Sequence, residues 1–245
     1  DFETILREHL KVLYPEKIIN KILSFDIFCY DTQEPAYLGH KKEFITAGRL
    51  DNLLSCFVGM TALAAAGNRF NQMLICTNHE ENGSVSTTGA SGAFVDSVLD
   101  RITPDPVTRR IALHNSFLVS MDNAHATHPN FKDKSDPAHN ILFNRGPVIK
   151  INANQRYATN SISSAIYKQI CLAADVTPQE FVMRSDMPCG STVGPMTAAR
   201  LGVRTVDVGA PTLAMHSIRE HTGAEDPFLL YKSILKFLEI DSYLS

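Results

Sequence analysis

The fold is decided by residues 161–208, which read SISSAIYKQICLAADVTPQEFVMRSDMPCGSTVGPMTAARLGVRTVDV. Apolar residues recur at helical spacing in 161–174 and 194–201, whereas 181–184 and 204–208 are short apolar runs. A helix and a strand that alternate twice indicate a sheet covered by helices. The stretch therefore predicts an α/β domain.

The same alternation extends outward from this stretch. The sequence predicts helices at 52–66, 89–101 and 227–240, and strands at 73–77, 116–121 and 148–151. Apolar spacing in Asp1–Ser24 predicts a helix interrupted near Pro15, and DIFCYDT from Asp26 is typical of a strand. The expected fold class is α/β, with a mixed, largely parallel sheet and helices on both faces.

Composition and charge narrow the classes of function. The chain has 245 residues, of which 44% are hydrophobic, and its 23 basic and 26 acidic residues give a net charge of -3. Such a balance lacks the basic field that attracts nucleic acid, so we expect no nucleic-acid partner. The sequence contains no long apolar run, so we expect no membrane partner, and its five cysteines contain no CxxC pair. We therefore expect a soluble, cytoplasmic protein without disulfides or thiolate-bound zinc.

Polar residues follow the expected strands at their carboxyl ends, where α/β sheets bind ligands. Asn78–Glu81 follow LICT, Asp122 follows FLVSM, and a loop reaching His216 follows TVDVG, while Asp51 precedes an expected helix. Carboxylates that converge on one edge repel each other unless a cation neutralises them. Oxygen and imidazole donors without thiolate suit Zn, Mn or Co. The pattern predicts a metal site, and two ions bridged by one carboxylate balance these charges better than one.

The adjacent Glu80 and Glu81 suggest a division of labour. Neighbouring side chains at a strand end point in different directions, so one can bind metal while the other acts as a general base. Each candidate also has a purely structural interpretation. Asp51 could cap a helix, Asp122 could form a turn, and His216 could be an ordinary interfacial histidine. The prediction of a metal site therefore rests on their joint placement.

Six stretches carry a family resemblance. They are GRLDNLLSCF (48–57), HEENGS (79–84), SMDNAHATHPN (120–130), GPVIKINANQRYATN (146–160), RSDMPCGSTVGP (184–195) and VGAPTLAMHSIRE (208–220). In this order they resemble the aspartyl aminopeptidase family of dinuclear zinc metallopeptidases, close to its bacterial members. The resemblance implies a zinc-peptidase-like three-layer domain that removes N-terminal Asp or Glu from peptides. It also implies a homo-oligomer, which is a dodecamer in the family.

The resemblance implies a role for each metal-site candidate. Asp51 would bridge two divalent ions, with Glu81 and His216 completing the ligands of one. Asp122 would bind the other ion, and Glu80 would be the catalytic general base.

The resemblance also implies substrate-binding residues. Lys150 aligns with the family lysine that pairs with the acidic side chain of the substrate's first residue. Tyr157, His125 and His128 fall in matching segments and are candidates for substrate contact or for support of the metal ligands. Ser185–Gly194 resembles a loop that lines the substrate pocket.

The chain departs from the family pattern in three places. The family's first metal-binding histidine stands in an N-terminal HTD-like context, which has no counterpart here. The family also inserts a large dimerisation domain ahead of the LDN motif, of which only the tail has a counterpart here. We therefore expect residues 1–39 to be the C-terminal remnant of that domain, and 40–245 to be a catalytic domain without its N-terminal part. Asn78 and Asn82 stand where the family usually has an acidic and an apolar residue.

Two other functions stay open. A catalytically silent scaffold or assembly fragment of the same fold would explain a metal site that lacks one ligand. A related two-metal amidohydrolase would act on small amides other than peptides.

Overall fold

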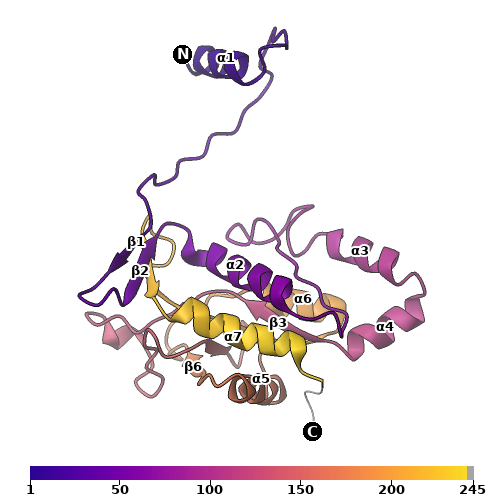
Figure 1. Cartoon of the computed structure of the whole chain (residues 1–245), viewed down its shortest axis with the longest axis vertical. Coiled ribbons are helices and arrows are strands. Elements are labelled where there is room, and N and C mark those ends of the chain that lie inside the picture. The colour runs from indigo at the N-terminus through magenta and orange to yellow at the C-terminus, as the bar shows by residue number, and fades with distance from the viewer. Residues whose placement is uncertain (242–245) are drawn as a thin grey trace. The chain divides into compact units, whose positions relative to one another are not determined.

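The structure, a computed structural model, describes residues 1–241 (Figure 1). Its α-helices are α1 (Phe2–Leu13), α2 (Leu50–Ala65), α3 (Phe94–Ile102), α4 (Pro106–His114), α5 (Ser161–Ala173), α6 (Val193–Leu201) and α7 (Asp226–Glu239). Its strands are β1 (Ala36–Leu38), β2 (Phe44–Ala47), β3 (Phe117–Met121), β4 (Ala124–His125), β5 (Val148–Ile151), β6 (Gln179–Val182), β7 (Arg204–Gly209), β8 (Pro211–Leu213) and β9 (Glu220–Gly223). A 3₁₀ helix, η1, spans Lys132–Lys134. From β5 to β7, strands and helices alternate as predicted.

The chain divides into two units, and the boundary lies between Thr32 and Gln33. In the first unit, the side chain of Asp1 caps α1. Arg7 of α1 donates a hydrogen bond of 2.8 Å to the carbonyl of Asn20. This bond joins the helix to the segment that follows it.

Two predictions for the first 35 residues are wrong. Neither the helix expected to continue after Pro15 nor the strand expected from Asp26 forms, since 14–35 contain no helix or strand. Ile18 and Phe28 are 90% and 84% exposed, so their side chains gain little burial. Apolar spacing alone therefore does not stabilise these elements, because a short helix needs a packed face and a strand needs a partner.

Two sheets form the framework of the second unit. One has the order β3-β7-β5-β6, in which β3/β7 and β5/β6 are parallel and β5/β7 is antiparallel. The other has the order β1-β2-β9-β8-β4 and is antiparallel except for β4/β8. In the first sheet the register places Ser120 beside Asp207 and Ile149 beside Val208. Each sheet contains both parallel and antiparallel strand pairs, so the predicted mixed α/β class is confirmed.

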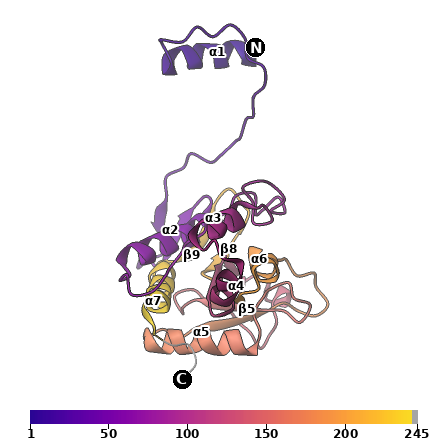
Figure 2. The same ribbon diagram turned by 90° about the vertical axis from the view of Figure 1, so that its right-hand side faces the viewer.

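Helices cover both faces of the four-stranded sheet, as predicted. Val119 of β3 packs into a core with α2, α5 and α7, whereas its neighbour Leu118 packs with α3 and α6. This alternation follows the two-residue period of a strand. Figure 2 shows α7 and α6 on opposite sides of the strands.

Residues 73–77 do not form the predicted strand. Leu74 lies against Gly59 of α2, and Ile75 packs on the apolar cluster of α3 and α6. Met73 and Cys76 are exposed, and the other three residues of the run are only partly buried. A short apolar run can be partly covered by such side-chain packing without any strand pairing, so the run alone did not determine its conformation. The bounds of two other elements differ from the prediction. The strand predicted at 181–184 spans Gln179–Val182, and the helix predicted at 89–101 begins at Phe94.

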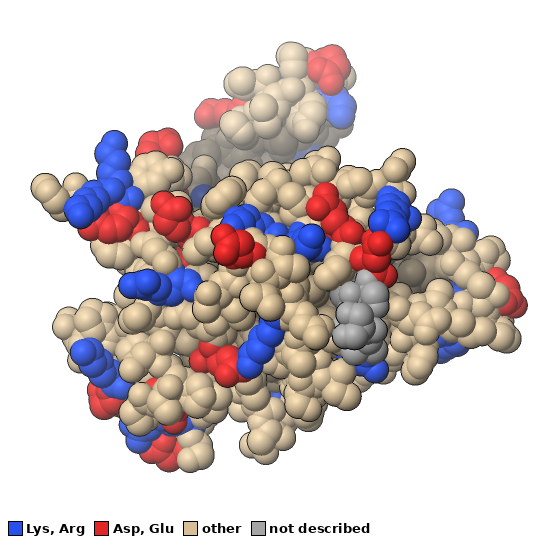
Figure 3. Space-filling model, turned by 60° about the horizontal axis from the view of Figure 1, so that its bottom comes forward, with Lys and Arg blue, Asp and Glu red and all other residues tan. Residues whose placement is uncertain are grey.

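Acidic and basic side chains are interspersed on the face of the molecule drawn in Figure 3. Neither sign dominates this face, so it produces no strong field of a single sign. Within residues 1–241, no helix is both long enough and apolar enough to cross a membrane.

Candidate metal centre

Asp51 lies in an irregular first turn of α2. Its φ and ψ of -85° and 111° are not helical, and the turn is preceded by Arg49 at a φ of 61°. Oδ2 of Asp51 lies 3.2 Å from Nε2 of His216, whereas the buried Oδ1 has no hydrogen-bond partner among residues 1–241. A buried carboxylate oxygen without a partner is unfavourable unless a cation or a water molecule binds it. This oxygen therefore fits the position of a metal ligand.

Three predicted ligands come together in one cluster. Oε2 of Glu81 lies 3.1 Å from Nε2 of His216, and one ligand atom from each of Asp51, Glu81 and His216 lies within 4.8 Å of the others. Two carboxylates and one imidazole form a donor set that suits zinc. The side chains of Glu81 and His216 are 55% and 61% exposed, so water and substrate can reach the cluster.

Glu220, at the start of β9, holds two of these ligands and was not predicted. Its carboxylate is 2% exposed and accepts backbone hydrogen bonds of 2.8 Å from Asp51 N and His216 N. One buried carboxylate thus connects the two chain segments that carry the ligands. The only signal in the sequence was its position at the end of the VGAPTLAMHSIRE stretch.

Asn52 makes a second connection that was not predicted. Its Nδ2 donates a hydrogen bond of 2.8 Å to the carbonyl of Met121, the residue before Asp122. The first turn of α2 is thereby joined to the end of β3, which brings Asp51 and Asp122 into the same site.

The carboxylates of Asp51 and Asp122 are close enough for their charges to repel each other, and Lys150 forms an ion pair with Asp122. Nζ of Lys150 donates to Oδ2 of Asp122 at 2.8 Å and to the carbonyl of Asn123 at 3.0 Å. Burial disfavours the Asp122 carboxylate, but the Lys150 ammonium and two neighbouring side chains together outweigh burial and lower the pKa of Asp122. Burial and then the charge of Asp122 raise the pKa of Asp51. Carboxylates thus exceed cations at this site, and a divalent cation would relieve their repulsion.

Glu80 is half-buried beside the same carboxylates. Burial first, and then the charges of Asp122 and Glu81, raise the pKa of Glu80 to about 7. A carboxyl group in this range can both accept and return a proton near neutral pH.

The predicted substrate-binding residues lie next to Asp122. Nζ of Lys150, whose side chain is 3% exposed, lies 5.3 Å from the centre of the Tyr157 ring. Tyr157 packs against Phe181, with ring centres 6.4 Å apart, and the ring of His125 lies 6.3 Å from the same Phe181. Lys150, Tyr157 and His125 therefore form one group, with Lys150 nearest to the predicted metal ligands.

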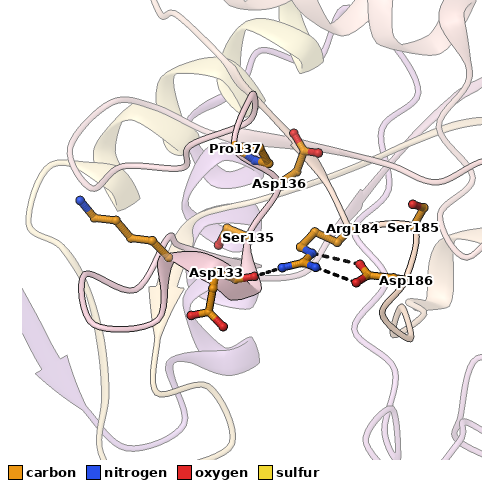
Figure 4. A pocket seen from close by; sticks show the side chains of 8 residues that line it. Asp133, Ser135, Asp136, Pro137, Arg184, Ser185 and Asp186 are labelled. Atoms are coloured by element: carbon orange, nitrogen blue, oxygen red, sulfur yellow. Dashed lines mark hydrogen bonds and ion pairs between the residues drawn. The ribbon is translucent and has the colours of Figure 1, made fainter.

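A separate hollow of about 430 Å³ lies between the loop after β4 and the loop after β6 (Figure 4). It is lined by Lys132, Asp133, Ser135, Asp136, Pro137, Arg184, Ser185 and Asp186. Arg184 forms an ion pair of 2.6 Å with Asp186 and donates to the carbonyl of Asp133. None of the predicted metal ligands lines this hollow, and the predicted pocket loop Ser185–Gly194 contributes only its first two residues. His128 packs against Phe131 in the loop after β4, with ring centres 4.8 Å apart.

The fold and the site together define an α/β protein with a cluster of carboxylates and one histidine that could hold a divalent cation. Residues 5–238 match the family described as Aminopeptidase I zinc metalloprotease (M18), and the chain belongs to this family. The family predicted from the six sequence stretches is thereby confirmed, and zinc is the metal of the family.

Relatives and solved structures agree with this family. A "Probable M18 family aminopeptidase 2" of Azotobacter vinelandii is 50% identical over 239 residues, which cover 97% of this chain and 55% of the relative. The cryo-EM structure of the Ape4 and Nbr1 complex matches with a TM-score of 0.81 at 40% identity, covering 85% of this chain and 42% of that one. The S. cerevisiae mApe1 dodecamer matches with a TM-score of 0.76 at 31% identity, covering 85% and 48%. The chain spans about half the length of the curated relatives it matches.

Proposed function

We propose that this chain carries the catalytic centre of a metal-dependent aminopeptidase that removes N-terminal Asp or Glu from peptides and uses two divalent ions. Zinc is the first choice, and manganese or cobalt are alternatives. One observation carries the proposal: Asp51 lies in one cluster with Glu81 and His216, and its carboxylate is close enough to that of Asp122 for their charges to interact. A carboxylate between two sets of donors is the arrangement that a bridging ligand requires.

Each residue of the site has a task in this reaction. Asp51, Glu81 and His216 would hold one ion, and Asp122 would contribute to the second. Bound ions would supply Lewis acidity for the scissile carbonyl and would neutralise the excess carboxylates. Glu80 would take a proton from the attacking water and return it to the leaving amine.

The preference for acidic residues rests on Lys150. Its ammonium has three N–H donors, of which Asp122 and the carbonyl of Asn123 take two. The third donor would bind the substrate carboxylate. Because Lys150 is buried beside the Tyr157 ring, a hydrogen bond between two charged groups would be stronger there than in water.

A panel of Asp-, Glu-, Leu- and Lys-linked chromogenic amides tests this function. We expect kcat/KM to be highest for the two acidic substrates, and Lys150→Met to lower the ratio of acidic to Leu substrate at least about tenfold. Lys168→Met, which removes an exposed lysine paired with Glu180, is the matched control and should leave the ratio unchanged. Glu80→Gln should reduce turnover of every substrate by about 10² to 10⁴.

Wild-type protein that hydrolyses all four amides equally would refute the acidic preference. It would instead support the small-amide hydrolase, provided that compact non-peptide amides are also cleaved.

A catalytically silent scaffold is the second candidate function, and one observation favours it. Among residues 1–241, the Asp122 side of the site supplies one carboxylate that Lys150 already neutralises. Elemental analysis of the purified chain separates the two candidates. Two zinc ions per chain support the peptidase, whereas one or none, together with no turnover, supports the scaffold.

We also propose that the chain forms a homo-oligomer in the cytoplasm. The dodecamer of S. cerevisiae mApe1 supports the first part by similarity. The five free cysteines support the second, because disulfides are rare in a reducing compartment. Light scattering coupled to size-exclusion chromatography would measure the oligomeric state, and a monomer at all concentrations would refute it.

A further inference from the structure

Asp207 is a fully buried carboxylate beside the site, and the proposed chemistry does not use it. It lies in β7, between β3 and β5 of the four-stranded sheet, and is 0% exposed. The register places it beside Ser120, two residues before Asp122. A carboxylate is rarely kept at such depth without several partners, because its desolvation is costly.

The partners of Asp207 belong to two loops that are far apart in the sequence. Its Oδ2 accepts a hydrogen bond of 2.6 Å from Ala158 N, and its Oδ1 accepts one of 2.6 Å from the Thr192 hydroxyl. Its own backbone N donates to the hydroxyl of Thr159 at 2.9 Å. The carboxylate and backbone of one residue thus bind both loops to the central strand.

The same two loops are also joined to each other. The Ser191 hydroxyl donates a hydrogen bond of 3.0 Å to the carbonyl of Arg156. The Thr192 hydroxyl, which donates to Asp207, accepts from Gly194 N at 3.2 Å and so caps α6. A Cβ atom at Gly194 would lie 2.3 Å from Oδ1 of Asp207, which shows how closely the first turn of α6 approaches this carboxylate.

Tyr157 connects this junction to the proposed substrate site. It precedes Ala158 directly, is 5% exposed, and places its ring 5.3 Å from Nζ of Lys150. Any loosening of the Ala158 to Asp207 bond would therefore free the backbone that holds this ring.

We propose that Asp207 is a positioning residue that fastens residues 156–160 and the start of α6 to the sheet and thereby holds Tyr157 against Lys150. The hydrogen bonds described above support the junction between the two loops and the sheet. Its effect on substrate rests on the proposed function, in which Lys150 binds the acidic side chain.

Hydrogen exchange of the Ala158 amide tests the junction without any need for activity. Asp207→Ala removes both acceptors, and we expect this amide to exchange at least tenfold faster. Asp207→Asn should restore most of the protection, because its amide oxygen can accept from Ala158 N while its NH₂ donates to the Thr192 hydroxyl. Thr192→Val removes one donor without changing charge and carries the test if Asp207→Ala does not fold.

Thr205→Val is the matched control. It deletes another buried hydroxyl of β7, one that donates to the carbonyl of Val203. We expect this variant to leave exchange at Ala158 within twofold of the wild type. Equal exchange in Asp207→Ala, Thr192→Val and the wild type would overturn the junction, as would equal acceleration in Thr205→Val.

Kinetics with an Asp-linked amide then test the effect on substrate. We expect Thr192→Val to raise KM about tenfold while kcat stays within threefold of the wild type and the zinc content per chain is unchanged. Faster exchange with an unchanged KM would overturn the effect on substrate. A wild-type chain without turnover would refute the proposed function, whereas the exchange experiment would still decide whether Asp207 fastens the loops.

Discussion

Glu220→Gln tests whether one buried carboxylate holds the metal centre together. The native side chain accepts hydrogen bonds of 2.8 Å from Asp51 N and from His216 N at 2% exposure. Glutamine keeps one acceptor oxygen, but its NH₂ faces the other backbone N–H. The change loses a charge-assisted bond, about 1.5–3 kcal/mol, and leaves a buried donor unpaired, about 1–3 kcal/mol. Relief of the repulsion between Glu220 and Asp51 returns part of this cost.

We therefore expect the free energy of unfolding to fall by about 3 kcal/mol, which for a chain of this size lowers Tm by roughly 6–12 °C. Zinc affinity should fall by about 10- to 100-fold, because the group that orients two ligands is lost. Urea and thermal denaturation of the chelator-treated protein measure the first effect, and calorimetric zinc titration measures the second.

Glu180→Gln is the control for these measurements. It removes a partly exposed ion pair of 2.6 Å with Lys168 and should change stability by less than about 1 kcal/mol. Glu220→Gln protein with the Tm and zinc affinity of the wild type would refute the reasoning, because Glu220 would then not hold the ligands.

Three further predictions follow from other features. Zinc at about 100 times its dissociation constant should raise the free energy of unfolding of the wild type by about 2.7 kcal/mol, as measured by urea denaturation. Asp51→Asn should remove most of this gain. Equal gains in both proteins would contradict Asp51 as a ligand. Gly209→Ala should cost about 1–3 kcal/mol in the same assay, because its Cβ would overlap the backbone carbonyl of Asp122, whereas Gly67→Ala, with no atom of another described residue within 4 Å, should cost little. Equal effects would contradict the close approach of β7 to the end of β3. Burial raises the pKa of Asp226 from 3.8 to about 6. The carboxyl group of Asp226 therefore binds a proton more readily in the folded state than in the unfolded state, and its contribution to stability increases as pH falls. The stability of the wild type relative to Asp226→Asn should therefore increase by about 2 kcal/mol from pH 7 to pH 4, and a constant or decreasing difference would contradict the raised pKa.

Local patterns in the sequence were sufficient for the class of fold and for most of the candidate site. Helix and strand periods report which side chains are buried, so the alternation in 161–208 predicted a mixed sheet between layers of helices. Acidic residues after expected strands predicted a rim of carboxylates, because strand ends meet at one edge of a sheet. The structure brings Asp51, Glu81 and His216 together there, and their assignment to metal ions stays a prediction.

The supporting contacts required the tertiary structure. The sequence did not single out Glu220 or Asp207, since an acidic residue in a strand has no local mark that distinguishes a buried anchor from a solvated one. Lys150 was predicted to meet substrate, and only the fold shows that Asp122 and Asn123 already take two of its donors.

The sequence by itself thus determined the class of fold, the family and the types of residue expected at the edge of the sheet. Only the tertiary structure decided which buried carboxylate binds which loop, and that 73–77 do not form a strand. The physical reason is the distance along the sequence over which the two effects act. Periodicity depends on neighbours a few residues apart, whereas burial of a charge is stabilised by partners that chain folding brings from distant positions.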